Sequence, residues 1–204
     1  MRAETYWRLT NWLGVLKPGA GGWAEGSVRP AMVRFPMQPV NSYSNATYPM
    51  AGWFVYGVVG TPESFVFALA MSVLGVGSFL YHAWPSTRTA ALDNFGMYAV
   101  FISLTTFVVG GGWLAMAVGA SVGAYLLRYA FTLNLNVMMG VFLWFGVVAT
   151  FPGRDVVLSI IAFAVAFAAW QADRWRVRFV GRWGHGAWHV LTAAAIAFMF
   201  SAAA

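Results

Sequence analysis

The sequence contains no cysteine and few charged residues of any kind. The absence of cysteine excludes disulfides, thiolate metal ligands and a thiol nucleophile, and it leaves the redox compartment undetermined. Charged residues make up only 9% of the 204 residues, whereas a soluble domain of this size carries about 25%. Because 60% of the residues are hydrophobic, we expect an integral membrane protein.

Lysine is almost as scarce as cysteine. Lys17 is the only one, and it precedes every long apolar segment. A retinal Schiff base needs a lysine inside a membrane helix, so a retinal protein is excluded. Residues 1–38 are polar, glycine-rich and basic, and we expect them to lie along the membrane interface ahead of a membrane domain over 39–204.

Seven apolar stretches are candidates for membrane spans, since a bilayer core about 30 Å thick requires about 20 residues per helix. They lie at residues 39–60, 63–84, 91–109, 113–132, 136–151, 155–172 and 184–203. Only the glycines at 110–112 separate the third and fourth stretches, which as one helix would be about 65 Å long. We therefore expect a tight turn there. The predicted fold class is all-α, a bundle of seven transmembrane helices.

The basic residues predict the orientation of these spans. With seven spans, all but one of the 12 Lys and Arg residues fall on the N-terminal side, and Arg154 alone falls on the other. Cytoplasmic loops are enriched in Lys and Arg, so we expect a cytoplasmic N-terminus and a C-terminus on the opposite side. The net charge of +6 then faces lipid headgroups, which argues against nucleic acid as a partner.

The unusual polar residues all map to the cytoplasmic end of the predicted bundle. Those with chemically active side chains are Ser78, His82, Asp93, His185 and His189. Each has a simple structural interpretation by itself: an interfacial histidine, an aspartate at a helix N-cap, or a small residue at a helix contact. None of these explains why all three histidines share one leaflet. Ionisable residues within a membrane usually face the bundle interior, so we expect them to converge.

The spacing of the histidines indicates a metal site. His185 and His189 lie four residues apart, as Ser78 and His82 do, and residues at this spacing project from one helix face. Paired histidines at this spacing are a familiar zinc-binding arrangement. Three neutral imidazoles with an open fourth position form a catalytic zinc site. The sequence therefore predicts one zinc ion bound by its three histidines.

Four segments together resemble the alkaline ceramidase family, part of a seven-helix superfamily that includes progestin and adiponectin receptors and haemolysin III-like proteins. The segments are NSYSN (41–45), GVGSFLYHAW (75–84), ALDNFGMY (91–98) and GHGAWHV (184–190). The resemblance covers about residues 23–190. It implies a zinc-dependent amidase that hydrolyses ceramide-like lipids to a fatty acid and a sphingoid base.

The same resemblance implies a role for each site residue. The three histidines ligate zinc, Asp93 deprotonates the attacking water and later protonates the leaving amine, and Ser78 donates to the developing oxyanion. Five further residues are predicted to support the site from a second layer or to shape its surroundings: Glu25, Asn41, Ser44, Asn45 and Trp188.

The resemblance is incomplete near the N-terminus. Eukaryotic members of the family carry a calcium site there around a Trp-Cys-Glu motif, where this chain has GWAEGS at 22–27. Trp23 and Glu25 are kept, but Gln38 stands in place of an acid. Calcium prefers more carboxylates than remain, so we expect no calcium.

Other functions stay open on the sequence alone. A metal-containing seven-helix receptor or signalling protein, and a related hydrolase of phospholipids or acyl lipids, fit the same motifs. A transporter is a further alternative, because buried acid and histidine sets also relay protons. A metal-free serine hydrolase is disfavoured, since the chain lacks a G-x-S-x-G elbow and the histidine pair would have no role. Oligomeric state, acyl-chain preference and the host membrane are undetermined.

Overall fold

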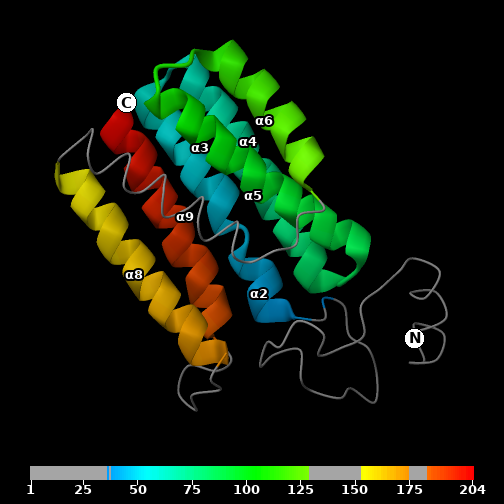
Figure 1. Cartoon of the computed structure of the whole chain (residues 1–204). Helices are drawn as coiled ribbons and strands as arrows, with labels where there is room; N and C mark the ends of the chain where they lie inside the picture. The colour runs from blue at the N-terminus through cyan, green and yellow to red at the C-terminus, as the bar shows by residue number, and fades with distance from the viewer. Residues whose placement is uncertain (1–35, 37, 129–152, 175–182) are drawn as a thin grey trace, which may run out of the picture.

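The computed structural model describes residues 36, 38–128, 153–174 and 183–204. Within these ranges the chain is helical and contains no β-strand. The helices are α2 (Pro39–Ser44), α3 (Thr47–Val59), α4 (Pro62–Ala83), α5 (Thr87–Val108), α6 (Trp113–Leu127), α8 (Arg154–Arg174) and α9 (Gly184–Ala203). Figure 1 shows the long helices side by side in a bundle, with the short α2 at one end beside the beginning of α9.

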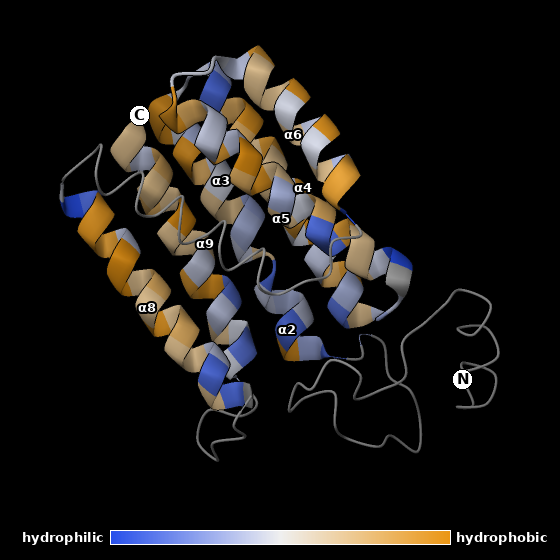
Figure 2. Ribbon diagram, in the orientation of Figure 1, coloured by the Kyte–Doolittle hydropathy of each residue, from blue (hydrophilic) through white to orange (hydrophobic). Residues whose placement is uncertain are grey.

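Four of the described helices are long and apolar enough to cross a membrane. These segments are Pro62–Ala83, Arg88–Val108, Arg154–Asp173 and Gly184–Ala203, and α6 is a shorter apolar helix. Hydrophobic residues dominate along the helices, whereas hydrophilic ones gather at the end that carries α2 (Figure 2). The all-helical fold is thus confirmed for the described part of the chain, which suggests a membrane protein, and the number seven stays a prediction. The fifth predicted span, 136–151, and the segment 1–35 lie outside the described residues.

The first predicted span is two helices rather than one. α2 ends at Ser44 and α3 begins at Thr47. Between them, the Asn45 side chain donates through Nδ2 to the Asn41 carbonyl oxygen over 2.7 Å. Asparagine and serine side chains compete in this way with the backbone bonds of a helix. Hydropathy alone predicts a continuous helix here because it ignores that competition.

Helix α5 begins earlier than its hydropathy predicts. The Ser86 side chain accepts a hydrogen bond from the Thr89 backbone N–H over 3.0 Å, and the Thr89 hydroxyl accepts one from the Ser86 N–H over 2.9 Å. This reciprocal pair is a capping box, and it starts the helix at Thr87. Asp93 therefore lies in the second turn of α5. The expectation that it occupies the first turn, and its interpretation as an N-cap, are wrong.

The α5–α6 hairpin turns where the glycines predict. α5 ends at Val108 and α6 begins at Trp113. Gly110 adopts a φ of 80°, a left-handed conformation that costs glycine little. Glu63, in the first turn of α4, accepts the Trp113 backbone N–H through Oε1 over 3.1 Å. This contact ties the hairpin to α4 at the end opposite α2.

Helices α4 and α5 approach closely enough for their backbones to touch. A Cβ added at Gly77 would lie 2.6 Å from the Leu92 carbonyl oxygen, and one at Gly96 would lie 2.4 Å from the Leu74 Cα. Small residues at helix contacts allow this approach in membrane bundles. As a result, residues next to these contacts on the two helices are held at short range.

Aromatic rings fill the bundle at the end away from α2. Phe200 of α9 stacks on Phe67 of α4, with ring centroids 4.4 Å apart, and on Phe107 of α5, with centroids 4.5 Å apart. Phe67 and Phe200 are completely buried. Contact between apolar rings therefore organises this end of the fold.

Candidate metal centre

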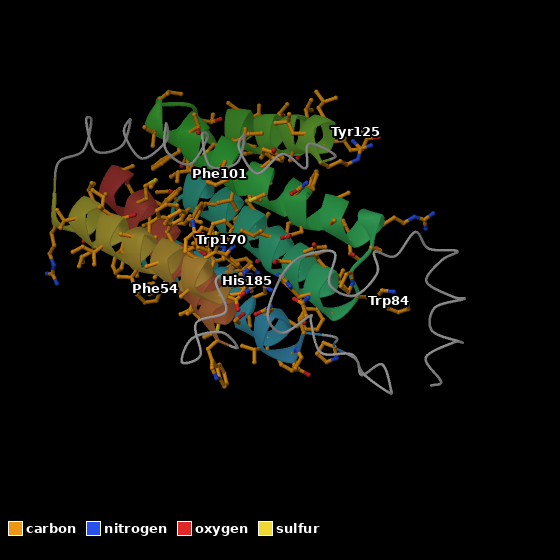
Figure 3. The ribbon with its side chains drawn as sticks, turned by 60° about the horizontal axis from the view of Figure 1, so that its bottom comes forward. Phe54, Trp84, Phe101, Tyr125, Trp170 and His185 are labelled. Atoms are coloured by element: carbon orange, nitrogen blue, oxygen red, sulfur yellow. The ribbon has the colours of Figure 1, made fainter. Side chains whose placement is uncertain are left out.

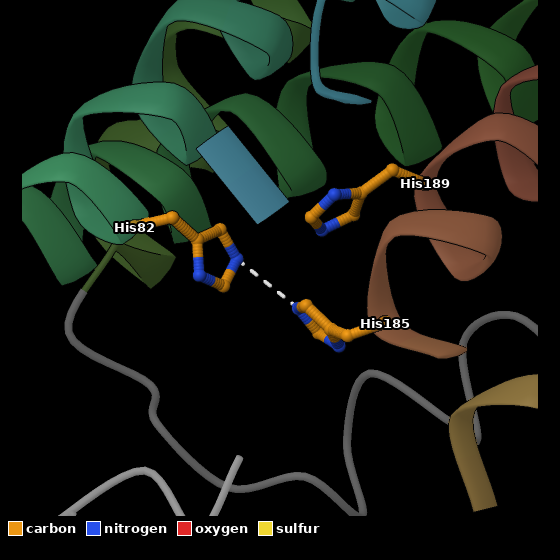
Figure 4. A group of neighbouring side chains, drawn as sticks. All are labelled: His82, His185 and His189. Carbon is orange, nitrogen blue, oxygen red and sulfur yellow. Dashed lines mark hydrogen bonds between the residues drawn. The ribbon is translucent and has the colours of Figure 1, made fainter. Parts of the chain in front are cut away.

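The three histidines converge from two helices. His82 lies in the last turn of α4, and His185 and His189 lie near the start of α9. Their side chains are all buried, with exposed fractions of 2%, 6% and 3%. One ring nitrogen from each residue lies within 4.8 Å of the others. Figure 4 shows the three rings facing a common space, so this group could hold a metal ion.

The distances suit an ion with imidazole ligands. His82 Nε2 and His185 Nε2 are 3.1 Å apart. Tetrahedral zinc at its usual distance from nitrogen places its ligand nitrogens about 3.3 Å apart. Imidazole also suits copper, nickel and iron. The three histidines that the sequence predicts could thus hold a metal ion.

The first turn of α9 packs closely against α2. A Cβ added at Gly186 would lie 2.9 Å from Val40 Cγ1 and 3.5 Å from Ser44 Oγ. Glycine at this position therefore lets α2 pack directly on α9. Ser44, which the sequence predicts near the site, reaches His189 as a result, with Oγ 2.8 Å from Nδ1.

Gln38 belongs to the site although it is absent from the predicted site residues. Its Oε1 lies 2.7 Å from His82 Nδ1, and Asn41 Nδ2 donates to the same oxygen over 3.0 Å. Gln38 and Asn41 are both buried. The available signal was spacing: Gln38 and Asn41 lie three residues apart, so they share a helix face.

Ser78 and Asp93 form a pair beside the histidines. The Ser78 hydroxyl hydrogen-bonds the Asp93 carboxyl group across the close contact between α4 and α5. Asp93 also interacts electrostatically with Tyr48, and the Tyr48 ring lies 6.0 Å from the His189 ring between centroids. Tyr48 therefore neighbours both the acid and a histidine.

The remaining predicted residues divide into three groups. Asn41 and Asn45 are buried in and just after α2, where the Asn45 side chain donates to the Asn41 backbone carbonyl oxygen. The Trp188 ring packs on α8, 5.7 Å from Phe163 and 5.8 Å from Trp170 between centroids, so its observed contacts are structural. Glu25 lies outside the described residues.

The site is internal, as intramembrane polar clusters usually are. Figure 3 shows His185 inside the bundle and Tyr125, which is 57% exposed, at its outer edge. No protein-family model matches this sequence, and no curated protein matches it. Function is therefore inferred from the chain's own residues together with the motif resemblance. Those residues offer three neutral nitrogen ligands, one acid and one hydroxyl in apolar surroundings.

Proposed function

We propose that this protein is a zinc-dependent intramembrane hydrolase that cleaves the amide bond of ceramide-like lipids. The observation that carries the proposal is the buried cluster of three histidines with a hydrogen-bonded serine–aspartate pair beside it. Metal ligands alone would serve storage or structure, whereas an adjacent acid and hydroxyl are the groups that hydrolysis requires. Three of the four motif segments that resemble alkaline ceramidases contain these same residues.

Zinc is the metal that best fits the donor set. Many catalytic zinc sites have three histidine ligands and leave the fourth coordination position free for water or substrate. The chain has three histidines that could bind one ion and no cysteine thiolate, which would favour a closed structural site. A zinc ion held there supplies a Lewis acid for the amide carbonyl and a nucleophile derived from water near neutral pH.

Asp93 provides the proton transfers. Hydrolysis breaks the amide C–N bond, adds OH to the acyl carbon and adds a proton to the leaving nitrogen. The Asp93 carboxylate accepts a proton from the attacking water and then passes it to the departing amine.

The contact between Ser78 and Asp93 suggests how the serine contributes. The ionised carboxylate that accepts the water proton can only accept hydrogen bonds, so in that state the Ser78 hydroxyl donates its single proton to Asp93. Once Asp93 has taken up a proton, that bond weakens and the Ser78 hydroxyl is free to donate to the developing oxyanion. The aspartate and the serine therefore act in sequence.

A lipid substrate agrees with the position of the cluster. The histidines lie toward the end of the bundle where hydrophilic residues gather (Figure 2). The amide of a ceramide-like lipid lies next to the polar headgroup. In a bilayer the amide therefore lies at the same depth as the histidines, while the lipid chains extend into apolar surroundings. With a cytoplasmic N-terminus, as the distribution of basic residues predicts, the site lies on the side of the cytoplasmic leaflet.

The deciding experiment measures metal content and lipid turnover on one preparation. Protein purified without chelators should contain about one zinc per chain by elemental analysis, and the His185→Ala, His189→Ala double variant should contain none. Labelled ceramide should release fatty acid with wild type, and Asp93→Asn should lower the rate by about 10²–10⁴-fold while zinc stays bound.

Each contrary outcome selects an alternative. Zinc without turnover of ceramide, phospholipid or acyl ester would indicate a receptor or signalling protein. Zinc with turnover of another lipid in the panel would keep the hydrolase and replace its substrate. Protein that never binds zinc would refute the zinc hydrolase and favour a proton relay.

A further inference from the structure

Helix α2 and its N-cap residue Gln38 contact two of the three histidines at their Nδ1 atoms. Gln38 Oε1 lies 2.7 Å from His82 Nδ1, and Ser44 Oγ lies 2.8 Å from His189 Nδ1. The Gln38 backbone N–H also donates to the His82 carbonyl oxygen over 3.2 Å. One short helix thus reaches ligands on both α4 and α9.

The hydrogen bond between Gln38 and His82 has a defined direction. A glutamine side-chain oxygen only accepts, so the proton of this bond belongs to His82 Nδ1. Asn41 Nδ2 donates to the same oxygen over 3.0 Å, which fixes the amide of Gln38 in this orientation. With two donors, both lone pairs of that oxygen are in use.

The bond between Ser44 and His189 has the same direction. A serine hydroxyl carries one proton, and Ser44 donates it to the Asn41 carbonyl oxygen over 3.0 Å. Ser44 Oγ must therefore accept from His189 Nδ1. Both histidines consequently carry their proton on Nδ1.

We propose that Gln38 and Ser44 are positioning residues that hold His82 and His189 as Nδ1–H tautomers, which leaves Nε2 of each ring for the metal ion. The proposal rests on the metal site proposed above. His82 Nε2 already faces His185 Nε2 at 3.1 Å, as this assignment requires. Outer hydrogen bonds of this kind fix ring orientation and strengthen the ligand.

Because the Gln38 amide is neutral, it adds no charge next to the His82 ring. A carboxylate in its place would accept from the same Nδ1–H, but it would add a negative charge close to the ring and make the imidazole a stronger donor. A methionine has a similar length and no oxygen to accept this bond. Gln38→Glu and Gln38→Met therefore separate hydrogen bonding from space filling.

The histidine count makes the tautomers directly observable. The chain has only three histidines, so protein labelled with ¹⁵N-histidine gives three imidazole signals by NMR in detergent micelles. In metal-free wild type, two rings should show the Nδ1–H pattern. Gln38→Met should remove it from one ring and Ser44→Ala from the other, whereas Gln38→Glu and Ser44→Thr should keep it.

Zinc affinity is the second readout, measured by competition with a chromophoric chelator. Gln38→Met and Ser44→Ala should each weaken zinc binding by about 10–100-fold. Gln38→Glu should bind zinc at least as tightly as wild type. Ser159→Ala is the matched control, because Ser159 also donates from a neighbouring helix to α9, at the Ala195 carbonyl, and touches no histidine.

The outcomes separate this proposal from the zinc hydrolase. Unchanged tautomers in Gln38→Met and Ser44→Ala would overturn it, as would equal zinc binding by Gln38→Glu and Gln38→Met. A different result would separate the two proposals: the wild type takes up no zinc but shows two Nδ1–H rings, and each variant loses this pattern from one ring. That result would support the positioning role and refute only the zinc hydrolase.

Discussion

The two ends of the bundle use the same helices for different purposes. α4 carries Phe67 near its start and His82 near its end, and α9 carries His189 and Phe200 in the reverse order along the antiparallel pair. Phe67 and Phe200 stack with centroids 4.4 Å apart, and the His185 and His189 rings lie 4.5 Å apart. Rings at similar separations therefore form an apolar core at one end and a polar cluster at the other.

The difference lies in what each kind of ring needs from its neighbours. Phenyl rings are satisfied by contact alone, and α4, α5 and α9 provide it. Buried imidazole nitrogens need hydrogen-bond partners or a metal. α2 supplies such partners at the histidine end, through Gln38 and Ser44. The short helix at this end thus meets a need of the imidazole nitrogens that the phenyl rings do not have.

Replacing a polar pair at the histidine end by apolar side chains should have the largest effect on zinc binding. His82→Phe combined with Gln38→Met removes one ligand together with its buried acceptor, so zinc binding should be lost completely. The metal-free double variant should unfold at a lower temperature than metal-free wild type, because the buried Asn41 Nδ2 loses the Gln38 oxygen to which it donates. Elemental analysis and thermal unfolding in micelles measure the two effects.

The single variant His82→Phe is the control for that experiment. It leaves the buried Gln38 oxygen with Asn41 Nδ2 as its donor, so this metal-free single variant should unfold at a higher temperature than the double variant. Stoichiometric zinc in the double variant would show that His82 is not a ligand.

Opening a cavity at the phenyl end should have the next largest effect. Phe200→Ala removes a completely buried ring that stacks on two others, and it should lower the free energy of unfolding by about 3–5 kcal/mol. Zinc affinity of the folded protein should not change. Phe54→Ala, at a side chain 72% exposed, is the matched control and should change stability by less than about 0.5 kcal/mol. Equal effects of the two variants would contradict the importance of the stack.

Removing a polar contact from the apolar part of the bundle should have the smallest effect. Ser159→Ala deletes the hydroxyl that donates to the Ala195 carbonyl, and interhelical hydrogen bonds in membranes contribute about 0.6 kcal/mol on average. Denaturant titration in mixed micelles should find a loss of this size and no change in zinc binding. A loss above about 2 kcal/mol would mean that polar contacts stabilise both ends of the bundle alike.

Much of the fold could be predicted because apolar segments and turn glycines act locally. The predicted stretches at 63–84, 155–172 and 184–203 agree with α4, α8 and α9 to within a few residues. The break after α2 could not be predicted from hydropathy, since it depends on the Asn45 side chain bonding to its own backbone. The early start of α5 was missed for a related reason, because its capping box is polar.

The candidate site was predictable to the extent that its residues are rare. Three histidines in an apolar chain attract notice, and their predicted convergence agrees with the geometry. The sequence marks Gln38 only as the residue that stands in place of an acid, which gives no sign that it contacts a histidine. Its contact with His82 joins residues 44 positions apart, which only the packing of α2 against α4 brings together.

The backbone contact between α4 and α5 gives the pair a mechanical property. At Gly77 and Gly96 there is no side chain left to compress between the two helices. Lateral pressure in a bilayer changes with lipid composition, yet it cannot bring two touching backbones closer. Changes in lipid composition therefore cannot shorten the distance between Ser78 and Asp93 by pressing these helices together.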